Sequence, residues 1–221
     1  MKKLFLPLTV VTAAMFAYAP VMIAGAPDEA TMGLVWKIFY FHVPSWIAMY
    51  CGIGVCGVAS AVHLFKNRPE ADRLAVSAAE LTVLFGMMGL VTGPLWARRA
   101  WGVWWVWDPR LTIALLMELV FIAYLLVRAY GGPGSDKLAA AVGLFGTVVS
   151  PFVYFSVNIW RTMHPLNTVV PSLPSSMRPP FELTSVAFVL LFGLLLTLRV
   201  NLASRQAMLD ELYLAEEDGA A

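Results

Sequence analysis

Apolar stretches of about twenty residues recur along the whole chain and constrain its fold more than any other feature. Of the 221 residues, 60% are hydrophobic and 13% are charged, whereas about a quarter of an average soluble domain is charged. A helix needs about twenty residues to cross the hydrocarbon core of a bilayer. The sequence therefore predicts an all-α integral membrane protein with about six transmembrane helices, near residues 4–25, 44–65, 76–96, 110–129, 138–158 and 182–201.

The two ends of the chain differ from this apolar body. Lys2 and Lys3 precede the first apolar run, as they would in a secretory signal peptide. That run exceeds the usual apolar core of a signal peptide, about 7–15 residues, so we expect it to be retained as a span. After Arg205 the chain becomes acidic. We expect one membrane domain over residues 1–205, followed by an acidic cytoplasmic tail over residues 206–221.

Lysine and arginine in short loops set the orientation of membrane helices, because positive charge is enriched on the cytoplasmic side. If six spans alternate, Lys2, Lys3, the 66–73 loop, the 128–137 turn and Arg199 share one side, which we predict to be cytoplasmic. Both termini then lie in the cytoplasm. The outer side still holds several cations, which suggests an anionic ligand there: Arg98, Arg99, Arg110, Arg161 and Arg178.

Other common functions find little support in the composition. The formal net charge is +1, and no basic run indicates nucleic-acid binding. Cys51 and Cys56 lie within one apolar stretch and do not form a CxxC pair. We expect both cysteines to pack as small apolar residues rather than to bind metal or form a disulfide.

The segment 98–112, between the third and fourth spans, holds four of the eight tryptophans of the chain. If it were helical, Trp101, Trp104, Trp105 and Asp108 would lie on one face, with Trp107 pointing elsewhere. Asp108 before Pro109 is a helix-start signal, so a new helix should begin there. An aromatic belt at the membrane surface is one interpretation. We favour an aromatic platform for a flat apolar ligand, formed by Trp101, Gly102, Trp104, Trp105, Trp107 and Asp108.

Two of the three histidines fit such a ligand. His42 and His164 lie at the outer ends of spans, in the loops on either side of the tryptophan segment. His63 follows His42 by 21 residues on one helix, or about 31 Å, and so cannot share its site. Two imidazoles beside an aromatic platform suit axial ligation of a haem iron. Arginine side chains, with Arg98, Arg99, Arg110 and Arg161 as candidates, would pair with the haem propionates. A cation, a quinone or a lipid would use only part of this set.

Residues 101–112 resemble the WWD signature, WGxxWxWDxRLT, of haem-handling proteins of cytochrome c assembly. Two further stretches, FYFHVP at 39–44 and YFSVNIWRTMH at 154–164, resemble the histidine loops that flank this signature in the CcmC family, the haem exporter proteins C. CcmF-type proteins share the signature but are much longer, and CcsA-type synthetases usually have more spans. The chain is therefore most similar to the CcmC family.

This resemblance implies that haem b (iron protoporphyrin IX) is held at the periplasmic face of the bacterial inner membrane by His42 and His164. It also implies transfer of the haem to the periplasmic chaperone CcmE for maturation of c-type cytochromes. CcmD and the CcmA/CcmB ABC transporter would be partners, with membrane lipid around the spans. We expect a delivery protein rather than an enzyme, although assistance with attaching haem to the chaperone stays open.

Three alternatives differ from this expectation. A haem-translocating permease subunit would need polar groups inside the membrane, and Glu80 and Glu118 are the obvious ionisable residues there. A CcsA-type cytochrome c synthetase component is disfavoured by the short chain. A membrane cytochrome b would need histidine pairs inside the bundle, which the sequence lacks.

Overall fold

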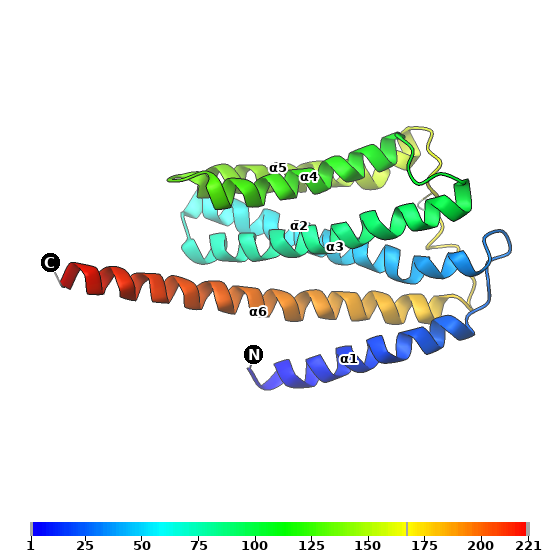
Figure 1. Ribbon diagram of the computed structural model, residues 1–221, viewed down its shortest axis with the longest axis horizontal. Coiled ribbons are helices and arrows are strands. Elements are labelled where there is room, and N and C mark those ends of the chain that lie inside the picture. The colour runs from blue at the N-terminus through cyan, green and yellow to red at the C-terminus, as the bar shows by residue number, and fades with distance from the viewer. Residues whose placement is uncertain (1, 167, 220–221) are drawn as a thin grey trace.

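The computed structural model describes residues 2–166 and 168–219. Within those residues the chain forms six long α-helices and no β-strand (Figure 1). Each of the six is long and apolar enough to cross a membrane, which confirms the predicted all-α fold. The helices are α1 (Lys2–Gly25), α2 (Phe39–Lys66), α3 (Pro69–Trp101), α4 (Pro109–Tyr130), α5 (Ser135–Ile159) and α6 (Arg178–Gly219), with a short 3-10 helix, η1 (Leu34–Ile38), before α2.

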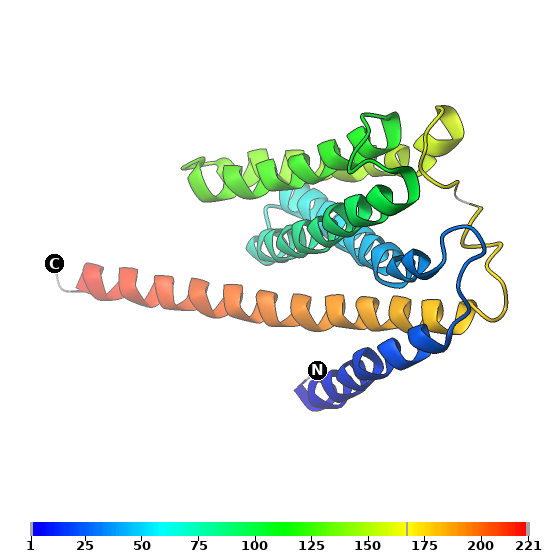
Figure 2. The same ribbon diagram turned by 45° about the vertical axis from the view of Figure 1, so that its right-hand side comes forward.

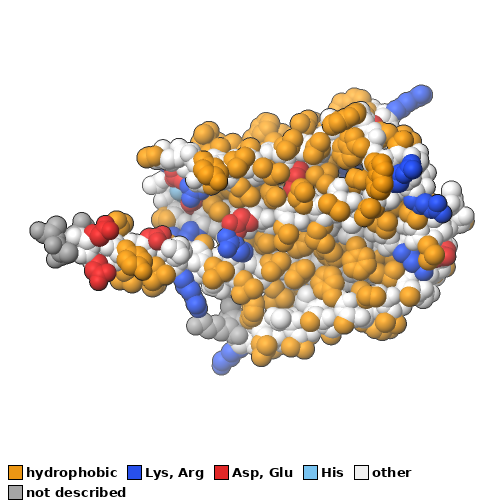
Figure 3. Space-filling model, in the orientation of Figure 1, with side chains coloured by type: hydrophobic (Ala, Val, Ile, Leu, Met, Phe, Trp, Pro, Cys, Tyr) orange, Lys and Arg blue, Asp and Glu red, His pale blue; other side chains and the backbone are white. Residues whose placement is uncertain are grey.

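The helices run roughly along one axis, and α2 with α3 and α4 with α5 form antiparallel pairs, while α1 packs on α6. Helices α4 and α5 lie on one side of the α2–α3 pair, while α6 and then α1 lie on the other (Figures 1 and 2). Helix α2 is central and packs against α3, α5 and α6. The main apolar cluster includes Ile53, Phe85, Phe121 and Phe188 from four of these helices. Hydrophobic side chains cover much of the bundle face that Figure 3 shows, as expected for a lipid-facing bundle.

Local sequence signals explain where several helices begin and end. Pro69 occupies the first position of α3, and Gly102, with φ of 77°, ends that helix in the left-handed conformation that glycine adopts without steric cost. The side chain of Asp108 accepts a hydrogen bond from the Leu111 amide (2.9 Å), and Pro109 follows as the first residue of α4. The predicted helix start at Asp108 is confirmed.

Three sequence-based boundaries need correction. The second span begins at Phe39 rather than near residue 44, so His42 lies in the first turns of α2 and not in a loop. The tryptophan segment does not form the single helical face considered above, because α3 ends at Trp101 and residues 102–108 are not helical. The last helix continues without a break past residue 205 to Gly219. The final two residues of the predicted tail, like Met1, lie outside the described residues.

The end of the bundle with the short 66–69 and 131–134 connections carries most of the described ion pairs. His63 is buried and lies 2.8 Å from Asp136, joining α2 to α5. Arg128 pairs with Asp72 at 2.7 Å. His63 thus lies at the end of α2 opposite to His42, as their separation of 21 residues predicts. Cys56 is fully buried in the main core and Cys51 packs against it, as predicted for small apolar residues.

Candidate functional site

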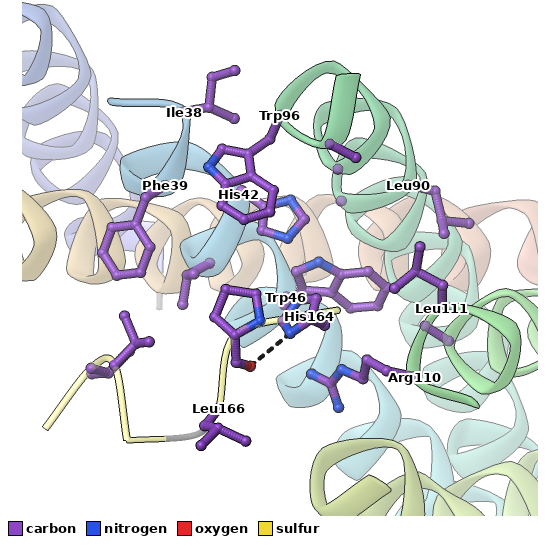
Figure 4. Close-up of a pocket in the computed structure, with 18 of the residues that line it drawn as sticks. Ile38, Phe39, His42, Trp46, Leu90, Trp96, Arg110, Leu111, His164 and Leu166 are labelled. Atoms are coloured by element: carbon purple, nitrogen blue, oxygen red, sulfur yellow. Dashed lines mark hydrogen bonds between the residues drawn. The ribbon is translucent and has the colours of Figure 1, made fainter. Parts of the chain in front are cut away.

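A cavity of about 410 Å³ opens at the other end of the bundle, beside the 26–38, 102–108 and 160–177 segments. This volume falls within the range of about 300–1,000 Å³ typical of small-molecule sites. Most of its lining is apolar or aromatic, and His42, His164 and Arg110 contribute polar groups. Two histidines that are 122 positions apart in sequence thus border one space (Figure 4).

Helix α2 places His42 in the cavity wall, and a threonine of α3 fixes its ring. The Nδ1 atom of His42 lies 2.9 Å from the Thr92 hydroxyl oxygen. That hydroxyl donates its only hydrogen to the Met88 carbonyl (2.7 Å), so its oxygen accepts from Nδ1–H of His42. The neutral ring then carries an unprotonated Nε2, the form that binds a metal ion.

The loop after α5 presents His164 in a similar manner. Its Nδ1 atom lies 2.9 Å from the carbonyl oxygen of Pro165, which can only accept a hydrogen bond. Nδ1 is therefore the protonated nitrogen, and Nε2 has a free lone pair. Burial, together with the nearby Arg110 guanidinium, lowers the pKa of His164 from 6.5 to about 4. The ring is thus neutral at physiological pH, as a metal ligand must be.

Asp108 connects the start of α4 to the loop that carries His164. One carboxylate oxygen caps α4, and the other accepts hydrogen bonds from the Thr162 hydroxyl (2.5 Å) and the Met163 amide (3.0 Å). The amide of His164 in turn donates to the Thr162 hydroxyl oxygen (3.0 Å). Sequence reasoning identified the cap but not this second role, which only the folded chain brings together.

Of the four arginines predicted to bind propionates, Arg110 alone is among the residues lining the cavity. It donates to the Val153 carbonyl oxygen of α5, and Figure 4 shows its side chain on the same side of the cavity as His164. Arg98 instead donates to the Gly102 carbonyl oxygen and lies 6.0 Å from the ring centroid of Trp104. Arg99 and Arg161 are exposed at the same end of the bundle.

The tryptophan segment divides between the cavity and the surface. Trp101 and Trp105 line the cavity, whereas Trp104 and Trp107 are 57% and 76% exposed. Gly102 and Asp108 also lie outside the lining. The Nε1 atom of Trp105 is buried and has no hydrogen-bond partner among the described residues. A ligand with acceptor atoms would satisfy this donor.

Three further tryptophans line the cavity that sequence reasoning did not assign to it, namely Trp36, Trp46 and Trp96. The ring centroids of Trp46 and His42 are 6.2 Å apart. Figure 4 shows the indole of Trp46 between the two histidine side chains in that view. The spacing of four residues between His42 and Trp46 was the available signal, because such residues share a helix face.

The two membrane carboxylates have different surroundings. Glu80 forms a two-pronged ion pair with Arg199 of α6, with both N–O distances at 2.5 Å. Glu118 is buried between α4 and α3, and neither of its oxygens has a hydrogen-bond partner among the described residues. Its closest approach is to Gly86, where an added methyl group would collide with the carboxylate.

Comparisons with known proteins give one consistent result. The family described as Heme exporter protein C matches residues 1–212. Heme exporter protein C of Bradyrhizobium diazoefficiens is 38% identical over 174 residues, covering 76% of this chain and 66% of that protein, just under two thirds of its length. The protein of the same name from Escherichia coli K12 is 30% identical over 80% of this chain and 73% of its own length. That from Paracoccus denitrificans is 30% identical over 92% and 93%.

The matched residues include the cavity, both of its histidines and the tryptophan segment, so the likeness extends over the site as well as the spans. The chain therefore belongs to the Heme exporter protein C family.

Proposed function

We propose that this chain binds haem in the cavity between His42 and His164 and delivers it to a periplasmic chaperone for maturation of c-type cytochromes. The observation that carries the proposal is the pair of imidazoles on one largely apolar cavity, each with Nδ1 hydrogen-bonded and Nε2 free. Ligating histidines are commonly oriented in this way by a hydrogen bond from the other ring nitrogen.

The remaining lining complements the rest of a haem molecule. A porphyrin is flat and apolar, and several tryptophan side chains line the cavity, including Trp101 and Trp105. Arg110 offers a guanidinium to a propionate, and the partnerless N–H of Trp105 offers a second donor. The exposed Trp104 and Trp107, together with Gly102, Arg98, Arg99 and Arg161, would form the outer rim. Asp108 would hold this rim against the His164 loop.

The proposed role is delivery rather than bond chemistry. The two histidines would hold the iron while one edge of the porphyrin stays accessible to the chaperone CcmE. CcmD and the CcmA/CcmB transporter are the other proposed partners. The cavity would face the periplasm from the inner membrane, with both chain termini in the cytoplasm. The ion-paired end of the bundle, with His63, Asp72 and Arg128, would then face the cytoplasm.

The test is the absorption and electron paramagnetic resonance spectrum of the purified protein loaded with ferric haem. We expect a low-spin signal of two histidine ligands, lost or converted to high spin in His42→Ala and in His164→Ala. His63→Ala is the matched control because it removes the third histidine at the opposite end of the same helix, and its spectrum should stay that of the wild type. A low-spin spectrum that survives both ligand substitutions would exclude this site.

A haem-translocating permease subunit is the second candidate, and the buried Glu118 without a partner is the observation that favours it. Glu80 adds little, because Arg199 neutralises it. A single carboxyl group marks no continuous polar path, so delivery at the outer end is the better-supported function. A CcsA-type synthetase role gains no separate support from the described residues.

A further inference from the structure

The Thr92 hydroxyl group of α3 lies within hydrogen-bond distance (2.9 Å) of Nδ1 of His42. A neutral imidazole has two tautomers, and only the form with hydrogen on Nδ1 leaves Nε2 available for a metal. We propose that Thr92 is a positioning residue that selects this tautomer and fixes the ring of His42 toward the cavity. The inference rests on the proposed function, because it concerns a ligand to haem iron.

The direction of the hydrogen bond follows from the neighbours of Thr92. Its Oγ1 lies 2.7 Å from the Met88 carbonyl oxygen and 3.3 Å from that of Gly89, and both can only accept. The single hydroxyl hydrogen is therefore directed to the helix backbone, and the lone pairs remain for His42 at 2.9 Å. The opposite tautomer would place two acceptors against each other and leave Nε2 protonated at the cavity.

The backbone of α3 beside Thr92 also fits His42 and Trp46 closely. A Cβ atom on Gly93 would lie 3.4 Å from Cε1 of His42, and one on Gly89 would lie 2.5 Å from Cε2 of Trp46. The absence of a side chain at Gly89 lets Trp46 of α2 pack directly against α3, and the His42 ring lies within van der Waals reach of Gly93. The His42 ring thus packs beside α3, where the Thr92 oxygen is its hydrogen-bond partner.

The hydrogen-bond partners of the two histidine rings differ in whether a substitution can remove them. The acceptor for His164 is the backbone carbonyl of Pro165, which most substitutions would leave in place. His42 has the Thr92 hydroxyl oxygen as a partner at 2.9 Å, beside the backbone carbonyl of Gly89, so a single change can remove the side-chain partner. Thr92→Val replaces the hydroxyl by a methyl group of similar size, and Thr92→Ser retains the hydroxyl.

The first measurement is independent of haem. Nitrogen-15 NMR of the full-length, haem-free protein labelled at histidine reports which nitrogen carries hydrogen, and comparison with His42→Ala assigns the signal. We expect the Nδ1–H form of His42 in the wild type and in Thr92→Ser, and a mixture or the Nε2–H form in Thr92→Val. Thr197→Val on α6 is the matched control, because Thr197 makes the same hydroxyl bond to a helix carbonyl (2.8 Å) without a histidine partner.

The second measurement is haem affinity with the low-spin resonance pattern. Loss of a partner that orients a ligand typically weakens metal binding by about 10- to 100-fold, so we expect a decrease of that size in Thr92→Val and recovery in Thr92→Ser. An unchanged tautomer in Thr92→Val would overturn the inference, as would an unchanged affinity. If the wild type shows the Nδ1–H form but His42→Ala keeps the low-spin spectrum, the proposed function fails and the haem part of the inference with it.

Discussion

The double role of Asp108 gives the sharpest prediction. Replacing Asp108 with asparagine keeps an oxygen that can cap α4, and asparagine is as good a cap as aspartate. The amide NH₂ group cannot accept the hydrogen bonds from Thr162 and Met163 that the second carboxylate oxygen now receives. Asp108→Asn should therefore release the His164 loop while leaving α4 intact.

The size of the effect follows from those two bonds. A hydrogen bond to a charged group contributes about 1.5–3 kcal/mol. Because Asp108 is half-buried, we use the lower value for each bond, which gives about 3 kcal/mol for the two bonds. This free energy corresponds to a change of about 150-fold in the ratio of the His164 loop bound to Asp108 to the loop released from it. Haem affinity should fall by between about 10- and 150-fold, because only the loop bound to Asp108 holds His164 at the cavity. Asp108→Ala should lower the free energy of unfolding by about 1 kcal/mol more than Asp108→Asn, because alanine cannot cap α4.

The assay is titration of the detergent-solubilised protein with ferric haem, followed by Soret absorbance, together with thermal unfolding of the haem-free protein. Asp28→Asn is the matched control, since it removes one negative charge from an exposed pair with Lys37 near the same end of the bundle. Equal haem affinity for Asp108→Asn and the wild type would refute the reasoning. Unchanged thermal stability in Asp108→Asn together with a loss in Asp108→Ala would show that the cap is the only role of this residue.

The remaining predictions concern the stability of the protein at acidic pH, the contact between α2 and α3 at Gly89, and the buried carboxyl group of Glu118. Because burial lowers the pKa of His164 to about 4, its neutral state adds stability above pH 6.5 that is lost as the pH falls toward 4. Thermal unfolding of the haem-free protein should therefore depend less on pH in His164→Leu over that window, and equal slopes would contradict this. Gly89→Ala should lower both thermal stability and haem affinity by displacing Trp46, whereas Gly54→Ala, with no atom within 4 Å of the added methyl, should not. Glu118→Leu should raise the unfolding temperature, since a buried polar group without a partner costs about 1–3 kcal/mol. Haem transfer to the chaperone should persist in Glu118→Leu, and its loss in a correctly folded variant would favour the permease function.

The spans were predictable from sequence because the length and hydropathy that a bilayer requires are local properties. The start of α4 was predictable for the same reason, since Asp108 and Pro109 form a short signal. The tryptophan segment does not continue as one helix because Gly102 takes a positive φ, which ends α3 at Trp101. Helix periodicity could not reveal this without knowing where α3 stops.

The composition of the cavity was only partly predictable. His42, His164, Arg110, Trp101 and Trp105 were identified from the motif and line the cavity, although their roles stay predictions. Trp46 and Trp96 resembled ordinary interfacial tryptophans, and Thr92 resembled any threonine that bonds to its own helix backbone. Their positions depend on how α2 packs against α3, which is a tertiary contact that sequence periodicity does not encode.

The 42 residues of α6 form a single helix whose side chain Phe181 lines the cavity and whose last turns extend beyond the ion-paired end of the bundle. The pair Glu80–Arg199 holds this helix to α3 about 27 Å along the axis from Phe181. Between these two residues α6 packs on α1, α2 and α3. One continuous helix therefore joins the cavity wall to the opposite end of the bundle.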